Sequence, residues 1–187
     1  MAEVKGVQLK GTMSFLSQRY GQAALEKATE SLSAEDRALL PTVFLDSTWY
    51  SEDVWRAVRR LTRILTASAG PELPVELGRH ISEYTFTGVY RSLLVNDPKK
   101  QAGKFGWVYD FFFRDAQKVE SEVHDNSTCT VTYRYKSGDK PTRSACVGTL
   151  GYSMRTLELA GASNVKGSHK KCVADGHDRC EFFLEWD

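Results

Sequence analysis

The stretch HKKCVADGHDRCEFFLEW, residues 169–186, decides how the C-terminal part of this chain folds. Apolar and polar side chains alternate in its second half, which is typical of a strand with one buried face. That face would carry Cys180, Phe182, Leu184 and Trp186. A short loop at Gly176 favours a hairpin between residues 164–172 and 180–186. Cross-strand partners have Cβ atoms about 4.5–5.5 Å apart, so we expect Cys172 and Cys180 to lie close together.

Two further groups can join this thiol pair. Cys146 falls in the first turn of a helix predicted over residues 143–160, and His169 and His177 flank Cys172 in the sequence. Three thiols and an imidazole are the ligand set of a tetrahedral zinc site, and four protein ligands leave no open position for catalysis. We therefore expect a structural Zn2+ ion that fixes the hairpin to the helix.

The sequence leaves alternatives open at this site. A regular strand points His169 and Cys172 to opposite faces, so His169 can be the fourth ligand only if a bulge interrupts the strand or the strand ends early; otherwise His177 takes that place. The cysteines could instead be free and buried, or Cys172 and Cys180 could form a disulfide, either under oxidising conditions or in a peroxide sensor. Cys129 lies on the apolar face of its own predicted strand and is interpreted as a core residue.

Helical periodicity dominates the N-terminal part of the chain, and a period of two follows it. After a short predicted strand over 4–9, the pattern predicts helices at about 13–20, 23–32, 52–65, 73–94 and 98–112. Two antiparallel strands are predicted over 118–123 and 128–135. Helices followed by such strands indicate an α+β fold, with an antiparallel sheet packed against helices. The 187 residues favour a single domain, helical over about 1–113 and built of sheet, helix and hairpin over about 114–187.

Composition excludes several classes of function. The chain carries 25 basic and 24 acidic side chains, a balance that predicts neither a nucleic-acid nor an acidic-membrane partner. It has no apolar stretch long enough to span a bilayer, so we expect a cytoplasmic protein. Arginines recur at helical spacing within 52–65, and with this charge balance we interpret them as an ordinary solvated helix face.

The C-terminal residues resemble the V4R (4-vinyl reductase) domain, found in the sensory modules of phenol-responsive bacterial transcription activators. The resemblance rests on CVGTLGYSM at 146–154, LELAG at 157–161 and the stretch at 169–186. It implies a Bet3-like fold, a homodimer, a buried small-molecule pocket and a role in regulating a partner protein. It also implies a zinc ion held by Cys146, His169, Cys172 and Cys180, with a histidine here where the phenol sensors have a carboxylate.

A pocket for an apolar or aromatic small molecule needs apolar walls and a few polar groups. The candidate ligand-binding residues are His80, Tyr84, Trp107, Tyr109 and Tyr152. The resemblance thus predicts a bacterial sensory domain, and the alternative is a protein-interaction scaffold on the same fold whose aromatic residues only fill the core. We predict no enzymatic activity, since the chain has no Cys-x-x-Cys, Gly-x-Ser-x-Gly or His-Glu-x-x-His motif.

Overall fold

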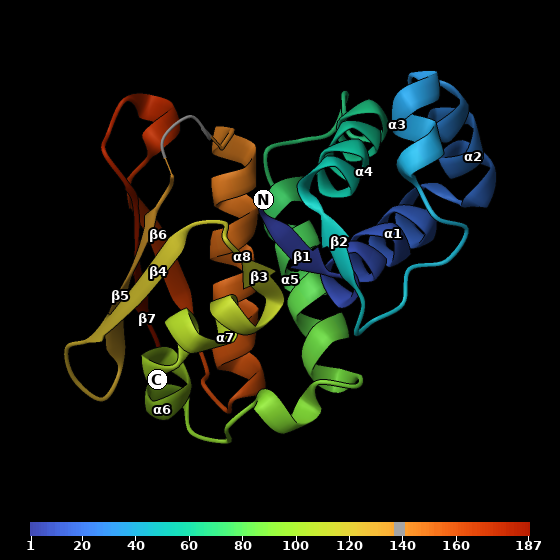
Figure 1. Cartoon of the computed structure of the whole chain (residues 1–187). Helices are drawn as coiled ribbons and strands as arrows, with labels where there is room; N and C mark the ends of the chain where they lie inside the picture. The colour runs from blue at the N-terminus through green and yellow to red at the C-terminus, as the bar shows by residue number, and fades with distance from the viewer. Residues whose placement is uncertain (137–140) are drawn as a thin grey trace.

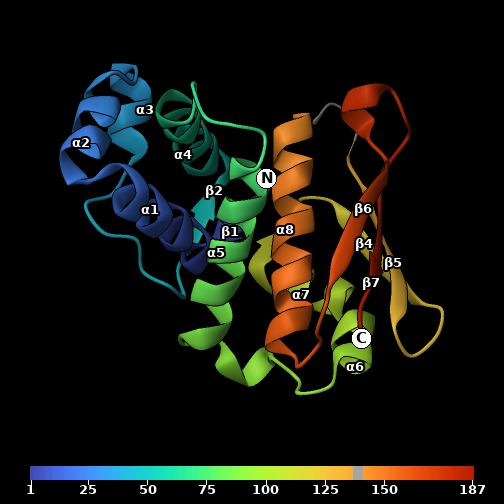
Figure 2. The same cartoon turned by 180° about the vertical axis from the view of Figure 1, so that it is seen from behind.

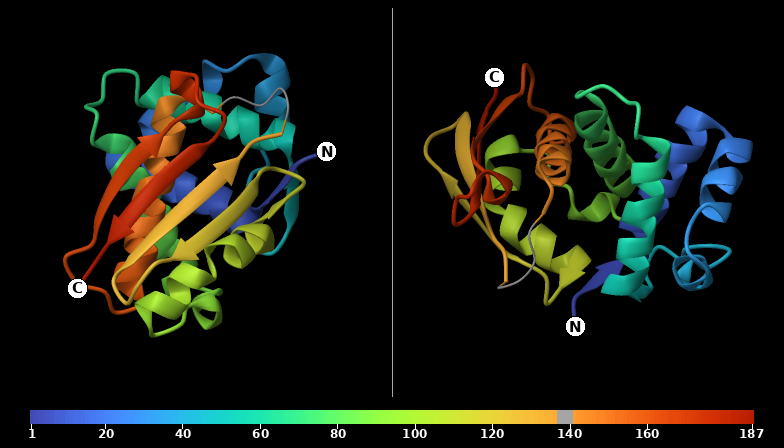
Figure 3. Two further views of the ribbon diagram at one scale, coloured as in Figure 1. Left: turned by 90° about the vertical axis from the view of Figure 1, so that its left-hand side faces the viewer. Right: turned by 90° about the horizontal axis from the view of Figure 1, so that it is seen from above.

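A four-stranded antiparallel sheet forms one side of the molecule, in the computed structural model that describes residues 1–136 and 141–187 (Figure 1). Its strand order is β4 (Lys118–Val123), β5 (Thr128–Arg134), β7 (Cys180–Glu185) and β6 (Lys166–Lys171). Buried and exposed residues alternate along β5 and β7, as the period of two predicts. The inner face packs on helices (Figure 3), and the outer face carries charged side chains such as Glu120, Arg134 and Glu181. The expected α+β class with an antiparallel sheet against helices is confirmed.

Helix α8 (Arg143–Leu159) lies between this sheet and the helical half of the chain (Figure 2). It packs on the sheet through buried Leu150 and Leu157, and on α5 (Leu73–Thr87) through glycines. A Cβ on Gly151 would approach the Cα of Val75 to 2.8 Å, and one on Gly78 would approach the backbone nitrogen of Tyr152 to 2.9 Å. Side chains are therefore excluded at both points, and the two helix backbones come close together.

The N-terminal half is a helical layer with its own small sheet. Strand β1 (Glu3–Lys5) leads directly into α1 (Gly6–Tyr20), followed by α2 (Gln22–Glu30) and α3 (Ala34–Leu39). Strand β2 (Trp49–Ser51) precedes α4 (Glu52–Leu65), and β1 pairs with both β2 and β3 (Phe113–Arg114). Apolar side chains of α1, α2 and α4 form a shared core that includes Leu16, Leu25 and Leu61.

Three elements differ from the sequence prediction. The predicted strand over 4–9 is a strand only as far as Lys5, because the following apolar residues are buried on several sides and their short run does not distinguish helix from strand. The predicted helix over 73–94 ends at Thr87, and a 3-10 turn, η1 (Arg91–Leu93), follows. The predicted helix over 98–112 is two helices, α6 (Pro98–Gly103) and α7 (Phe105–Phe112), which meet at Lys104.

The end of α8 and the hairpin follow the prediction closely. Gly161 has a φ of 104°, a left-handed conformation that glycine adopts at low cost just after a helix. A 3-10 turn, η2 (Val173–Asp175), and Gly176 at a φ of 94° form the hairpin loop. Among the described residues, no helix is both long and apolar enough to cross a membrane.

Candidate functional site

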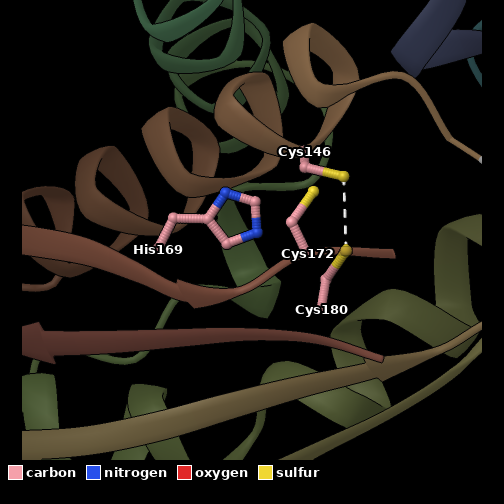
Figure 4. Close-up of side chains that lie close together, drawn as sticks. All are labelled: Cys146, His169, Cys172 and Cys180. Carbon is pink, nitrogen blue, oxygen red and sulfur yellow. Dashed lines mark hydrogen bonds between the residues drawn. The ribbon is translucent and has the colours of Figure 1, made fainter. Parts of the chain in front are cut away.

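Four side chains from α8 and the β6–β7 hairpin meet between that helix and the end of the sheet. Ligand atoms of Cys146, His169, Cys172 and Cys180 all lie within 4.8 Å of one another (Figure 4). Cys146 is in the first turn of α8, which begins where the Thr142 hydroxyl accepts a hydrogen bond from the Ala145 N–H. The other three come from the β6–β7 hairpin, so the cluster joins the hairpin to the helix.

A β-bulge explains how His169 joins this cluster. The register of β6 against β7 shifts between His169 and Lys171, which is the interruption that the sequence argument requires. His177 is exposed, and its Nδ1 lies 3.2 Å from the carbonyl oxygen of Cys172. The structure therefore brings His169, and not His177, to the three thiols.

The buried imidazole of His169 lacks hydrogen-bond partners among the described residues. Both of its ring nitrogens are buried, and neither has a hydrogen-bond partner within the described part of the chain. Its ring packs against Phe182 with centroids 4.6 Å apart. Burying polar atoms without hydrogen bonds costs about 1–3 kcal/mol per group, so this arrangement is stable only if another interaction satisfies the ring.

The thiols of Cys146 and Cys180 are coupled, with their sulfur atoms 3.3 Å apart. A hydrogen bond from Cys146 lowers the pKa of Cys180, and the Val173 N–H, 3.4 Å from the same sulfur, lowers it further. The same shared proton raises the pKa of Cys146. Since the thiolate is the form of cysteine that binds metals, the lowered pKa of Cys180 favours metal binding at this sulfur. Cys129 is separate from the cluster: it lies in the core, and burial raises its pKa to about 12.

A cavity of about 870 Å³ lies beside this cluster. It is bounded by α1, by α4 and the loop that follows, by α5 and α7, by the end of β5 and by the first half of α8. Its apolar walls include Leu77, Ile81, Phe105, Val108, Phe112 and Val147. Cys146 lies in the sequence between Ala145 and Val147, which both line the cavity. One turn of α8 therefore contributes to the cavity wall and to the thiol cluster.

Two of the five candidate ligand-binding residues line this cavity, namely Tyr109 and Tyr152. His80 lies elsewhere, against α1, where its Nε2 is 3.3 Å from the Ser14 hydroxyl and burial lowers its pKa. Tyr84 stacks beside His80 and does not line the cavity. Trp107 is 53% exposed on the outer side of α7.

The cavity's polar groups are phenols and guanidinium groups. Tyr133 and Tyr135, at the end of β5, join Tyr109 and Tyr152 in the lining, and burial raises the pKa of Tyr133, Tyr135 and Tyr152. Trp55 and the α4 arginines also line it, and Arg56, Arg60 and Arg63 are exposed there, as the interpretation of a solvated helix face expects; the sequence did not show that this exposed face also borders a cavity. The signal was present as arginines at helical spacing on α4, namely Arg56, Arg59, Arg60 and Arg63.

Comparison with known proteins identifies the fold. No family model and no curated protein sequence matches the chain. An Fe(II) unliganded H-NOX protein from K. algicida matches with a TM-score of 0.68 and 16% identity, over 98% of this chain and 96% of that one. The Fe(II)CO form of an H-NOX domain from Shewanella oneidensis matches with a TM-score of 0.70 and 14% identity, over 98% of each chain. An oxygen-binding H-NOX domain related to soluble guanylate cyclases matches at 0.69 and 14%, over 98% and 95%. The chain has the fold of these proteins.

This finding corrects three expectations. The resemblance to V4R and Bet3-like proteins is wrong as an account of the fold, since the similar structures are H-NOX proteins along nearly the whole chain. The phenol-sensor type of function is overturned with it, because these neighbours are described by their iron, CO and oxygen states. The expectation of structural zinc as cofactor is overturned for the same reason: the similar H-NOX structures contain Fe(II), and the cysteine cluster alone does not show zinc.

The prosthetic group that this fold implies is haem, and the cavity residues do not fit it. Haem iron is held by an axial His, Cys, Met or Tyr. The described lining contains no His, Cys or Met. Burial raises the pKa of Tyr133, Tyr135 and Tyr152, so these phenols stay protonated and lack the charge of a tyrosinate ligand. The described lining therefore has room for an organic molecule and offers only phenols, and no His, Cys or Met, as axial ligands for iron.

Proposed function

We propose that this chain is a sensory domain that binds a small organic molecule in the cavity between α4, α5, α7, β5 and α8, and passes its occupancy to a partner protein or to a second copy of the chain. This role is regulatory, cytoplasmic and not enzymatic. The observation that carries the proposal is the cavity itself. Its volume of about 870 Å³ and its largely apolar walls with a few phenols match the properties of small-molecule sites.

The position of the cavity supports signalling. Helix α8 contributes its wall, packs closely on α5 and carries Cys146, so a ligand that moves the first half of α8 would shift both the helical layer and the hairpin. Gly78 on α5 and Gly148 on α8 both line the cavity at the crossing of the two helices. A packed crossing of this kind transmits displacement, because it cannot absorb added volume.

The test is binding of an apolar fluorescent probe, N-phenyl-1-naphthylamine, to the purified chain. We expect its fluorescence to rise on binding, and Val147→Trp to abolish the rise by filling the cavity. Val89→Trp is the matched control, since Val89 is 68% exposed and outside the lining. Val147→Phe serves if the larger substitution prevents folding, as judged by circular dichroism. A probe that does not bind the wild type, or binds Val147→Trp and Val89→Trp equally well, would refute the proposal.

Adding haemin to the purified chain tests separately whether the cavity residues can ligate haem iron. We expect a spectrum without the features of axial histidine or thiolate ligation. A sharp Soret band typical of such ligation would show that a residue outside the described lining reaches the iron. Thermal unfolding of the same samples reports whether either molecule stabilises the folded state.

We also propose that Cys146, His169, Cys172 and Cys180 form a binding site for one metal ion. The specific observation is the buried His169 ring, which lacks hydrogen-bond partners while lying within reach of three thiols. Two thiolates bound to one ion at about 2.3 Å each lie no more than about 4.6 Å apart, close to the 4.8 Å that bounds this cluster. Thiolate and imidazole donors favour soft or borderline metals over magnesium or calcium.

Elemental analysis of the purified chain tests this second proposal and names the metal. We expect about one equivalent in the wild type and in Cys129→Ser, and none in Cys180→Ser. Cys129 is the matched control because it is equally buried but lies outside the cluster. Equal metal contents in the two serine variants would exclude the site.

A further inference from the structure

We propose that the surface formed by the small sheet β2–β1–β3 and the outer side of α7 is the docking site for an acidic segment of a partner protein, which supplies carboxylates together with apolar side chains. This inference rests on the proposed function and specifies the partner that receives the signal. We call this surface the basic–aromatic strip. Its central residues are Lys5, Trp49, Tyr90, Trp107, Phe111 and Arg114.

The small sheet contributes one half of the strip. Lys5 of β1 pairs with Trp49 of β2, and Glu3 of β1 pairs with Arg114 of β3. Because side chains alternate along a strand, Glu3 and Lys5 share the face opposite to buried Val4. On that outward face the Arg114 guanidinium lies 3.8 Å from the Trp49 ring centroid, and the Lys5 Nζ lies 4.9 Å from it. Two cations therefore meet one indole ring.

Helix α7, which lies next to this sheet, contributes the other half (Figure 1). The Lys5 Nζ is 3.5 Å from the ring centroid of Phe111 and 5.6 Å from that of Tyr90. Trp107 precedes Phe111 by one helical turn, and their ring centroids are 5.9 Å apart. Lys104 extends the strip, with its Nζ 5.9 Å from the Trp107 ring. Exposed aromatic rings of this kind are enriched at protein–protein interfaces.

The strip has an excess of positive charge. Arg114 has one carboxylate neighbour, Glu3, at 3.7 Å. Among the residues that the structure describes, no carboxylate lies within ion-pairing distance of Lys5 or Lys104, whose ammonium groups contact rings instead. Burial and the nearby Arg114 lower the pKa of Lys5, so its surroundings oppose its positive charge. A carboxylate from outside would offset that opposition, which favours an acidic partner.

A protein segment fits this strip better than an anionic membrane does. Lys5 is half-buried among three rings, so it can meet one inserted carboxylate but not a broad layer of headgroups. Asp110 is exposed on α7 beside Phe111, and Glu3 lies at the other end of the strip. A uniformly anionic bilayer would be repelled by both acids. A peptide can place its carboxylates between them.

Helix α7 also connects the strip with the cavity. Val108 and Phe112 line the cavity, whereas Trp107 and Phe111 of the same helix belong to the strip. The Phe112 ring contacts the ring of Tyr90, with centroids 5.1 Å apart. A ligand that displaces α7 would therefore move the aromatic groups that a partner contacts.

Fluorescence anisotropy of a labelled peptide tests the docking site. The probe is an octapeptide of glutamates with one tryptophan and one leucine, and its counterpart has glutamine in place of every glutamate. We expect the wild type to bind the acidic peptide about tenfold more tightly than the counterpart, and added salt to weaken that binding. The double variant Lys5→Gln, Lys104→Gln should lose about tenfold in affinity for the acidic peptide, since each partly exposed charge contributes modestly.

Lys27→Gln is the matched control, because Lys27 is exposed on α2 and outside the strip. If circular dichroism shows that the double variant does not fold, Trp107→Ser replaces it, since Trp107 is exposed. Equal affinities of the wild type for the two peptides would refute the docking site. So would equal affinities of the wild type and the double variant for the acidic peptide. Binding to phosphatidylglycerol vesicles without binding to the peptide would overturn the choice of a protein partner.

The same samples separate this inference from the proposed cavity. We expect saturating N-phenyl-1-naphthylamine to change the affinity for the acidic peptide by about fivefold or more, a typical coupling between two sites. If the naphthylamine binds but the peptide affinity stays the same, the cavity stands and the strip is refuted as its output. If the naphthylamine does not bind while the peptide still requires Lys5 and Lys104, the cavity fails and the docking site is supported.

Discussion

Replacing Gly151 by alanine should separate α5 from α8. A Cβ at this position would overlap the carbonyl oxygen of Val75 and approach its Cα to 2.8 Å. Both atoms belong to the backbone of α5, so no side chain can rotate away, and the helices themselves have to move. Overpacking of this kind costs about 1–3 kcal/mol.

Gly148 provides an internal control on the same helix. A Cβ there would meet the carbonyl oxygen of Pro74 at 3.2 Å, a contact that a small adjustment relieves. Alanine is favoured over glycine within a helix by about 1 kcal/mol at either position. The difference between Gly151→Ala and Gly148→Ala therefore isolates the packing cost, because the helix-propensity gain cancels.

We expect the free energy of unfolding of Gly151→Ala to be about 1–3 kcal/mol below that of Gly148→Ala. For a chain of this length, about 2–4 °C of melting temperature corresponds to each kcal/mol. Urea unfolding followed by tryptophan fluorescence and by circular dichroism measures the difference, and equal m-values would show that the two variants lose the same structure. A Gly151→Ala protein as stable as Gly148→Ala would refute the close crossing of α5 and α8.

Three further predictions test the core and the buried charges. Phe182→Ala should lower the free energy of unfolding by about 3–5 kcal/mol, measured by urea unfolding, because the ring is fully buried in the core between the sheet and the helices. Tyr152→Phe should leave the ligand-free protein equally stable or up to about 1 kcal/mol more stable by the same measurement, since its hydroxyl has no partner; a clear loss of stability would contradict this. Burial opposes ionisation of Glu158, but hydrogen bonds from Arg79 and Arg155 outweigh it and lower its pKa below 4.5. The folded state therefore gains stability from this carboxylate above about pH 4.5 and loses it as the pH falls through the folded pKa. Glu158→Gln should accordingly be less stable than the wild type at pH 7. If the difference in unfolding free energy between the two proteins did not narrow toward pH 3, the stabilising ion pairs of Glu158 would be contradicted.

The local pattern of the sequence determined much of the C-terminal half. Alternation along residues 128–135 and 180–186 predicts strands that the structure contains, and the helix predicted over 143–160 ends at Leu159, just before Gly161. The closeness of Cys172 and Cys180 also follows from the hairpin, whereas Cys146, 34 residues before Cys180, joins them only because α8 packs on the sheet. The strands, the helix and the hairpin depend on contacts between near neighbours in the chain, which periodicity records.

Only the tertiary structure decided which fold surrounds them. The tail motif at residues 169–186 led to the wrong family, because a hairpin with cysteines does not specify the helices that pack on it. The cavity is formed where α4, α5, α7 and α8 meet, and its lining comes from segments far apart in sequence. The α4 arginines have the spacing of a solvated face, and three of them are exposed, but only the packing of distant segments makes that face the border of a cavity. Sequence periodicity shows which side of a helix is apolar and which is polar. Tertiary packing determines whether the polar side faces solvent or borders a cavity.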